Sequence, residues 1–90
     1  MKFAFMIMGR SGKAVLPDGE TYIIGVKSME EAEKTAKELQ EEGFDALEIC
    51  GYFKEEGTKK LIEATGGKMP VGYVVHLPEQ DDLFSKVFKN

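Results

Sequence analysis

The chain has 90 residues, enough for one small domain and too few for a second. Twelve basic residues against sixteen acidic ones give a net charge of −4, which argues against binding to nucleic acid or to an anionic membrane surface. The single cysteine, Cys50, excludes an internal disulfide and fits a reducing cytoplasm. We expect a cytoplasmic domain. A homo-oligomer is plausible, because so short a chain buries a modest core on its own.

The first predicted strand is Lys2 to Met8, a segment that is apolar on both sides of its alternation. Such a segment is typical of a central strand, although its direction in the sheet is left open. It is too short to cross a membrane and lacks the full layout of a signal peptide. Gly9 to Lys13 follow as a polar loop. The turn Pro17 to Gly19 then joins two β-prone segments into a small hairpin.

A helix is predicted to begin after Ser28, because Ser28 and Glu31 have the spacing of a capping box. Four apolar residues recur at helical spacing and form its buried stripe: Met29, Ala32, Ala36 and Leu39. The charged residues between them are expected to face water. Gly43 suits the end of this helix.

The segment Asp45 to Gly51, DALEICG, indicates a buried strand. The strand rests on Ala46, Leu47, Ile49 and Cys50, which leave neither face polar apart from Glu48. This is expected of a parallel strand with both faces covered by helices. A second helix is predicted over residues 54–67. Gly57 inside it costs about 1 kcal/mol relative to Ala, which indicates close packing or a shifted helix boundary.

The last predicted strand covers residues 70–77, PVGYVVHL, and Pro78 stops it. The tail over residues 78–90 opens with acidic residues and closes with lysines. It carries four apolar residues on one side: Leu83, Phe84, Val87 and Phe88. This pattern predicts a short terminal helix.

Three successive strand-then-helix units start near Thr21, Asp45 and Val71, and right-handed crossovers would make their strands parallel. The sequence therefore predicts a single α/β domain over residues 1–90. We expect a mostly parallel sheet of four or five strands, three helices, Rossmann-like or flavodoxin-like βα units and a short hairpin. In such a sheet the loops at the carboxyl ends of the strands form the usual ligand crevice.

Cys50 and His76 are the only residues of their kinds, and each lies near the end of one of two neighbouring predicted strands. A thiol and an imidazole that meet at this edge would form a His-activated nucleophile. The structural alternative is the commoner case. A free cysteine is commonly a small buried apolar residue, and a strand-end histidine is commonly held by a structural hydrogen bond.

Glu48 is the third candidate for chemistry, as a general base if it is buried, whereas pairing or exposure to solvent would make it structural. The candidate ligand-binding residues at the same edge are Arg10, Ser11, Tyr52 and Glu79. The loop around Arg10 could cradle a phosphate or carboxylate, but it lacks the known phosphate-binding spacings and an ordinary surface loop is the alternative. One His and one Cys fall short of a zinc site, so neither a metal nor a cofactor is expected.

Three segments of the sequence resemble a known family: MKFAFMIMG at the start, SMEEAEKTAKELQEEGFDALEICG in the middle and IEATGGKMPVGYVVHLPEQDDLF near the end. The family consists of small prokaryotic proteins catalogued as a domain of unknown function. The resemblance covers nearly the whole chain apart from the loop and hairpin at residues 10–20, which is shorter than expected of the family. It implies an α/β domain and supplies no activity, substrate or catalytic residue.

The leading hypothesis is that the domain binds a small metabolite, an anion among the candidates, at the carboxyl edge of the sheet. In an enzymatic version, Cys50 or Glu48 takes the reactive role, His76 transfers a proton and Arg10 positions the substrate. The alternative is an oligomeric structural or regulatory module without catalytic activity. Whether the protein is an enzyme is left open by the sequence.

Overall fold

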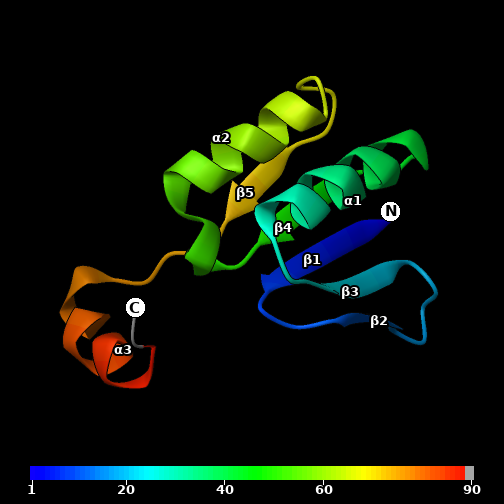
Figure 1. Ribbon diagram of the computed structural model, residues 1–90. Helices are drawn as coiled ribbons and strands as arrows, with labels where there is room; N and C mark the ends of the chain where they lie inside the picture. The colour runs from blue at the N-terminus through cyan, green and yellow to red at the C-terminus, as the bar shows by residue number, and fades with distance from the viewer. Residues whose placement is uncertain (89–90) are drawn as a thin grey trace.

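The computed structural model describes residues 1–88 and shows a five-stranded sheet with three α-helices (Figure 1). The strands are β1 (Phe3–Met8), β2 (Gly12–Val15), β3 (Thr21–Val26), β4 (Ala46–Ile49) and β5 (Val71–Tyr73). The α-helices are α1 (Met29–Glu41), α2 (Lys54–Ala64) and α3 (Asp81–Val87). Two short 3₁₀ helices precede α2 and α3, η1 (Gly51–Phe53) and η2 (Pro78–Gln80). The predicted α/β class is confirmed.

The strand order is β2-β3-β1-β4-β5, with β2 antiparallel to β3 and every other neighbouring pair parallel. The predicted hairpin is therefore confirmed as β2 and β3. β1 is the central strand, as its apolar alternation predicts, and its direction is parallel to β3 and β4. In register, Phe5 lies between Ile23 of β3 and Glu48 of β4.

Both crossover helices, α1 and α2, pack side by side on the same face of the sheet (Figure 1). The connections β3-α1-β4 and β4-α2-β5 move across the sheet in the same direction, so right-handed crossovers put both helices on one side. The expectation that helices cover both faces is wrong for this reason. We call the uncovered surface the open face. Its larger side chains are Phe3, Phe5, Ile7, Ile23 and Glu48.

The core lies between the sheet and the two helices. Its buried apolar residues are Ala4, Met6, Ile24, Val26, Ala32, Ala36, Leu39, Phe44, Leu47, Ile49, Phe53, Leu61 and Met69. Three of the four residues in the predicted stripe of α1 belong to this core, and Met29 packs against it half-buried. Ala4 and Met6 are fully buried under the helices, so the alternate residues of β1 face the other way, onto the open face.

Local interactions explain where α1 begins and why α2 contains a glycine. Ser28 Oγ accepts a hydrogen bond from the Glu31 N–H at 3.1 Å, which confirms the predicted cap. The Glu31 carboxylate accepts the Lys27 N–H at 2.6 Å, one residue earlier than in a standard capping box. In α2, a Cβ at Gly57 would lie 3.0 Å from the Phe53 Cβ, so close packing accounts for the glycine.

The last strand is shorter than predicted, because β5 ends at Tyr73 and the predicted strand extends to Leu77. Its neighbour β4 ends at Ile49, opposite Tyr73, and the chain then turns into η1. The Val74 N–H still donates to the Ile49 carbonyl at 2.9 Å, but the residues beyond have no continuing β4 strand beside them. Strand propensity alone does not extend a ladder that has lost its partner.

Residues 74–88, here called the C-terminal arm, are exposed along their whole length. The arm contains η2 and the predicted terminal helix, which is confirmed as α3. In Figure 1 the helix lies away from the sheet and from α1 and α2. The final residues of the predicted helix, Lys89 and Asn90, lie outside the described part of the chain.

In the β2-β3 turn, the Asp18 carboxylate accepts the backbone N–H of Glu20 at 2.8 Å and that of Thr21 at 3.0 Å. It also accepts the Thr21 hydroxyl at 2.8 Å. The hydrogen bond from Glu20, followed by those from Thr21, lowers the pKa of Asp18 below its ordinary value of 3.8. A carboxyl whose pKa is lower in the folded protein stabilises it above the unfolded pKa, and this contribution is lost as the pH falls through the folded pKa.

We predict that Asp18→Ala destabilises the protein near neutral pH and destabilises it less at about pH 3, where the unfolded-state carboxyl is protonated. Urea denaturation at the two pH values measures the difference. Glu41→Gln, an exposed change on α1, serves as the control. A loss of stability that is equally large at both pH values would contradict the assigned role of the charged carboxylate.

Candidate functional site

The carboxyl ends of four parallel strands meet at one edge of the sheet, here called the carboxyl rim. Its segments are 9–11 after β1, 27–28 after β3, 50–52 after β4 and 74 onward after β5. β4 and β5 are parallel neighbours, as the site hypothesis requires. The rim therefore collects several of the predicted site residues.

Cys50 lies at the rim half-buried and packs against the core. Its Sγ accepts a hydrogen bond from the Met8 N–H at 3.4 Å, and its own N–H donates to the Met6 carbonyl at 3.0 Å. Both contacts join the end of β4 to the end of β1. In the folded chain the thiol thus makes structural contacts, as the alternative hypothesis describes.

His76 lies in the C-terminal arm, three residues beyond β5. Its Nε2 is 2.6 Å from Asp81 Oδ1, and its ring stacks on Phe84 with a centroid distance of 4.1 Å and an interplanar angle of 8°. These contacts belong to the arm, whereas the contacts of Cys50 belong to the sheet. The thiol and the imidazole therefore have separate partners, and the nucleophile hypothesis stays a prediction.

The other predicted site residues fall on three different surfaces. Glu48 lies half-buried on the open face, where a Cβ on Gly72 would come within 2.6 Å of its Oε2. Arg10, Ser11 and Tyr52 are exposed at the rim, and Glu79 is exposed in η2 of the arm. The structure thus brings Arg10, Ser11, Cys50 and Tyr52 to one edge. It places Glu48 and Glu79 elsewhere.

Lys54 is a feature of this edge that sequence reasoning missed. It joins η1 to α2, four residues after Cys50, with φ 57° and ψ −176°. Glycine is the residue that normally adopts these backbone angles. Holding any other residue in this conformation costs on the order of 1–3 kcal/mol. No turn-forming composition marks the position in the sequence.

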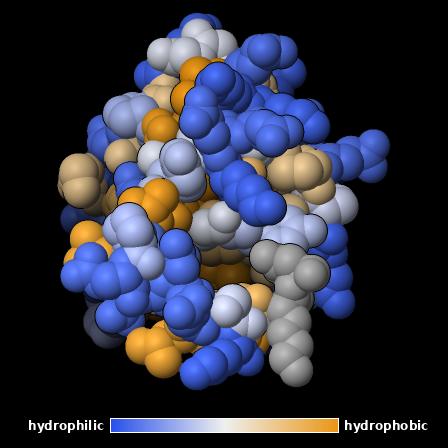
Figure 2. All heavy atoms as spheres, turned by 90° about the vertical axis from the view of Figure 1, so that its left-hand side faces the viewer, coloured by the Kyte–Doolittle hydropathy of each residue, from blue (hydrophilic) through white to orange (hydrophobic). Residues whose placement is uncertain are grey.

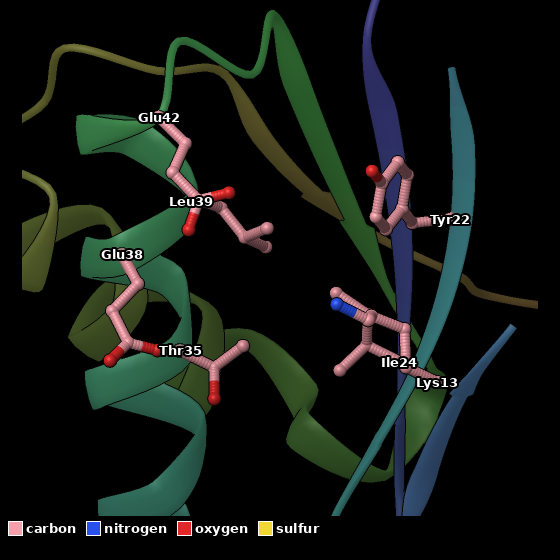
Figure 3. Close-up of a pocket in the computed structure, with 7 residues that line it drawn as sticks. All are labelled: Lys13, Tyr22, Ile24, Thr35, Glu38, Leu39 and Glu42. Carbon is pink, nitrogen blue, oxygen red and sulfur yellow. The ribbon is translucent and has the colours of Figure 1, made fainter. Parts of the chain in front are cut away.

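Two cavities lie on the helix side of the molecule. One, of about 170 Å³, opens between α1 and the β2-β3 edge (Figure 3). Its lining residues are Lys13, Tyr22, Ile24, Thr35, Glu38, Leu39 and Glu42. A shallow groove of about 320 Å³ runs between α1 and α2, lined by Glu33, Lys60, Glu63 and Ala64. The first is small beside the roughly 300–1,000 Å³ of ligand pockets, and neither is lined by a predicted site residue.

Apolar surface is concentrated on the open face and on the C-terminal arm. Ile23 of the open face is 39% exposed, and the three large residues of β1 beside it are half-buried. Figure 2 shows the side from which the arm projects, with hydrophobic groups among the charged ones and on the floor of a recess. The arm and the sheet thus both expose side chains of core type to solvent.

Within residues 1–88, no three His, Cys, Asp or Glu side chains are grouped so that they could hold a metal ion. None of the helices described there combines the length and the apolar character needed to cross a bilayer.

These features define an α/β protein in which, over the described residues 1–88, helices cover one face of a mostly parallel sheet and leave the other open. Over residues 1–89 the sequence matches the family of unknown function DUF6506, and the chain belongs to this family. The resemblance drawn from the sequence is thereby confirmed. No curated protein and no solved structure matches the chain.

We predict that native Cys50 reacts with iodoacetamide several-fold more slowly than the same thiol in the urea-unfolded chain, because burial and the Met8 contact restrict it. Quenched alkylation followed by mass spectrometry gives both rates, and Cys50→Ser controls for labelling elsewhere. Faster reaction in the native protein would contradict the structural role and favour the nucleophile.

Proposed function

We propose that this protein is a self-associating α/β module of the cytoplasm that works without catalytic activity of its own. The observation that carries the proposal is the C-terminal arm, which is exposed throughout although it is rich in large apolar residues. These residues are Val74, Val75, Leu77, Leu83, Phe84, Val87 and Phe88. Their exposed fractions run from 39% to 73%. Exposed apolar surface of this extent is typical of an interaction site.

The dimensions of the single chain support the same proposal. Its Cα radius of gyration is 13.4 Å, whereas a compact domain of this length has about 12 Å. The projecting arm accounts for the difference in shape (Figure 1). An arm that buries little of its apolar surface in its own domain gains that burial when another protein surface covers it.

The sheet supplies a second, independent support. Parallel sheets are found almost only with both faces covered, because their strands are apolar on both sides. Here α1 and α2 cover one face, and the large side chains of β1 on the open face remain partly exposed. Association would cover the open-face side chains of β1, a strand whose apolar alternation is typical of burial on both faces.

The cytoplasmic location is part of this proposal and rests on Cys50. Its thiol is free, and it contributes to packing at the end of β4. A thiol used in this way is stable in a reducing compartment and has no disulfide partner in the sequence.

A second candidate function is the binding of a small metabolite, an anion among the candidates, at the carboxyl rim. The observation that favours it is the strained backbone of Lys54, since such conformations cluster at ligand sites. Arg10 and Tyr52 would supply a cation and an aromatic surface, and the enzymatic version would add Cys50. The module ranks first because the exposed apolar surface extends over both the arm and the sheet.

For the module, we predict that the protein is a dimer in solution by light scattering and that Val87→Glu weakens the dimer at least about tenfold, or 1.4 kcal/mol. Val87 is 73% exposed, so the change acts on association more than on folding. Ser85→Glu, which adds the same charge on another side of α3, is the matched control and should leave the dissociation constant nearly unchanged. A monomeric wild-type protein would contradict the proposal.

For the second candidate, we predict that a ligand of the rim raises the melting temperature of the wild type in a screen of small anionic metabolites and raises it less in Arg10→Ala. Lys68→Ala, an exposed change after α2, is the control. Equal shifts in all three proteins would place binding away from the rim. A screen without any shift would remove the candidate.

A further inference from the structure

We propose that the C-terminal arm of one copy lies on the open face of a second copy, and that the second copy returns its arm to the first. Such a pair is two-fold symmetric, so each interface is made twice by the same residues. The inference rests on the proposed self-association and names the two surfaces that would meet.

The receiving surface is the open face over β1 and β3. Phe3, Phe5 and Ile7 form a row along the central strand, and Ile23 lies beside Phe5 in register. The neighbouring open-face positions are small: Gly12, Ala14, Gly25, Ala46 and Gly72. A row of large apolar groups flanked by small ones can accept a helix that packs along it.

Glu48 sets one border of this surface. Its carboxylate lies over Gly72, on the β5 side of the open face. Covering an unpaired carboxylate would cost desolvation energy, so a helix placed over β1 and β3 leaves Glu48 in water. Glu48 is the cross-strand neighbour of Phe5, so the helix is placed on the β3 side of β1.

The docking element is α3, which is amphipathic. Leu83 and Val87 lie four residues apart, and so do Phe84 and Phe88, so the two pairs share one side of the helix. The polar residues Asp82, Ser85 and Lys86 occupy the rest of its surface. The Phe84 and Phe88 rings stack with centroids 5.9 Å apart, which orders part of the apolar side before any partner binds.

The course of the linker favours a second copy over the arm's own sheet. The chain leaves the rim at Val74 and runs through Val75, His76 and Leu77 to η2. His76 is tied to the arm by its contact with Asp81 and by its stacking on Phe84. Folding the arm back under its own sheet would require the chain to reverse its direction at the rim between Val74 and Leu77. Docking on a second copy keeps the linker as it stands.

The available area is in the range that a dimer needs. Aromatic side chains contribute roughly 150–250 Å² each when buried, so the apolar groups of the arm, at their exposed fractions, present on the order of 500 Å². The open face adds a smaller area, because Ile23 is 39% exposed and the large residues of β1 are half-buried. Since each copy contributes both an arm and an open face, the sum approaches the roughly 800 Å² per partner of stable interfaces.

Opposite charges lie at the start of the arm and at the rim next to the open face. Glu79, Asp81 and Asp82 make the start of the arm acidic. The rim beside β1 and β3 carries Arg10 and Lys27, both exposed. Opposite charges around an apolar contact favour one partner orientation over others.

A complementation experiment tests this interface in the full-length chain. One variant, Leu83→Glu with Val87→Glu, disables the arm, and a second variant, Ile23→Glu, disables the open face. Each is expected to be monomeric by light scattering and folded by circular dichroism. When the two are mixed, the intact arm of the second variant meets the intact open face of the first, so we expect a heterodimer with about half of the native contacts. Ile62→Glu on α2 is the matched control, since Ile62 and Ile23 are both 39% exposed.

The possible outcomes separate this inference from the proposed function. A monomeric wild-type protein overturns both the arm exchange and the proposed self-association. If, in that case, the arm and open-face variants also melt at a lower temperature than the wild type, the arm packs on its own sheet. A dimeric wild type whose variants do not recover on mixing overturns the exchange alone. Ile23→Glu that stays dimeric indicates an arm-to-arm contact, and an arm variant that stays dimeric indicates a sheet-to-sheet contact. If Ile23→Glu does not fold, Ile23→Gln replaces it in the same mixture.

Discussion

The handedness of two crossovers is the constraint on which the rest of this structure depends. β3, β4 and β5 follow one another across the sheet in one direction, so right-handed connections bring α1 and α2 to the same side. That side becomes the core. Within residues 1–88 the other side of the sheet receives no helix, and the next segment of the chain, the C-terminal arm, projects beyond the rim (Figure 1). The handedness of the crossovers thus explains the uncovered face, whereas the arm begins where β5 loses its partner strand.

Much of the fold was predictable from local patterns. The apolar alternation of β1, the capping residue Ser28 and the stripe on α1 each identify an element from neighbouring residues alone. The missing helix layer on the open face was not predictable in this way, because it depends on the order of the strands. The alternation of β1 nevertheless carries information about that face, since Phe5 and Ile7 have the character of residues that become covered.

The candidate site could be predicted only in part from local sequence patterns. The parallel pairing of β4 and β5 was predictable, but the length of β5 depends on β4, which ends opposite Tyr73. For this reason His76 belongs to the arm and contacts Asp81. Cys50 stays in the sheet and contacts Met8. The strained conformation of Lys54 had no signal in the sequence, because lysine is not a residue that favours it.

The most direct test of the exchanged arm is an isotope-filtered NMR experiment on a mixed sample of labelled and unlabelled protein. If the arm is exchanged, we expect contacts between the methyl groups of Val87 in one copy and the side chains of Phe5 and Ile23 in the other. A spectrum in which the methyl groups of α3 show contacts only within their own chain, or in which the open face meets another open face, would contradict it.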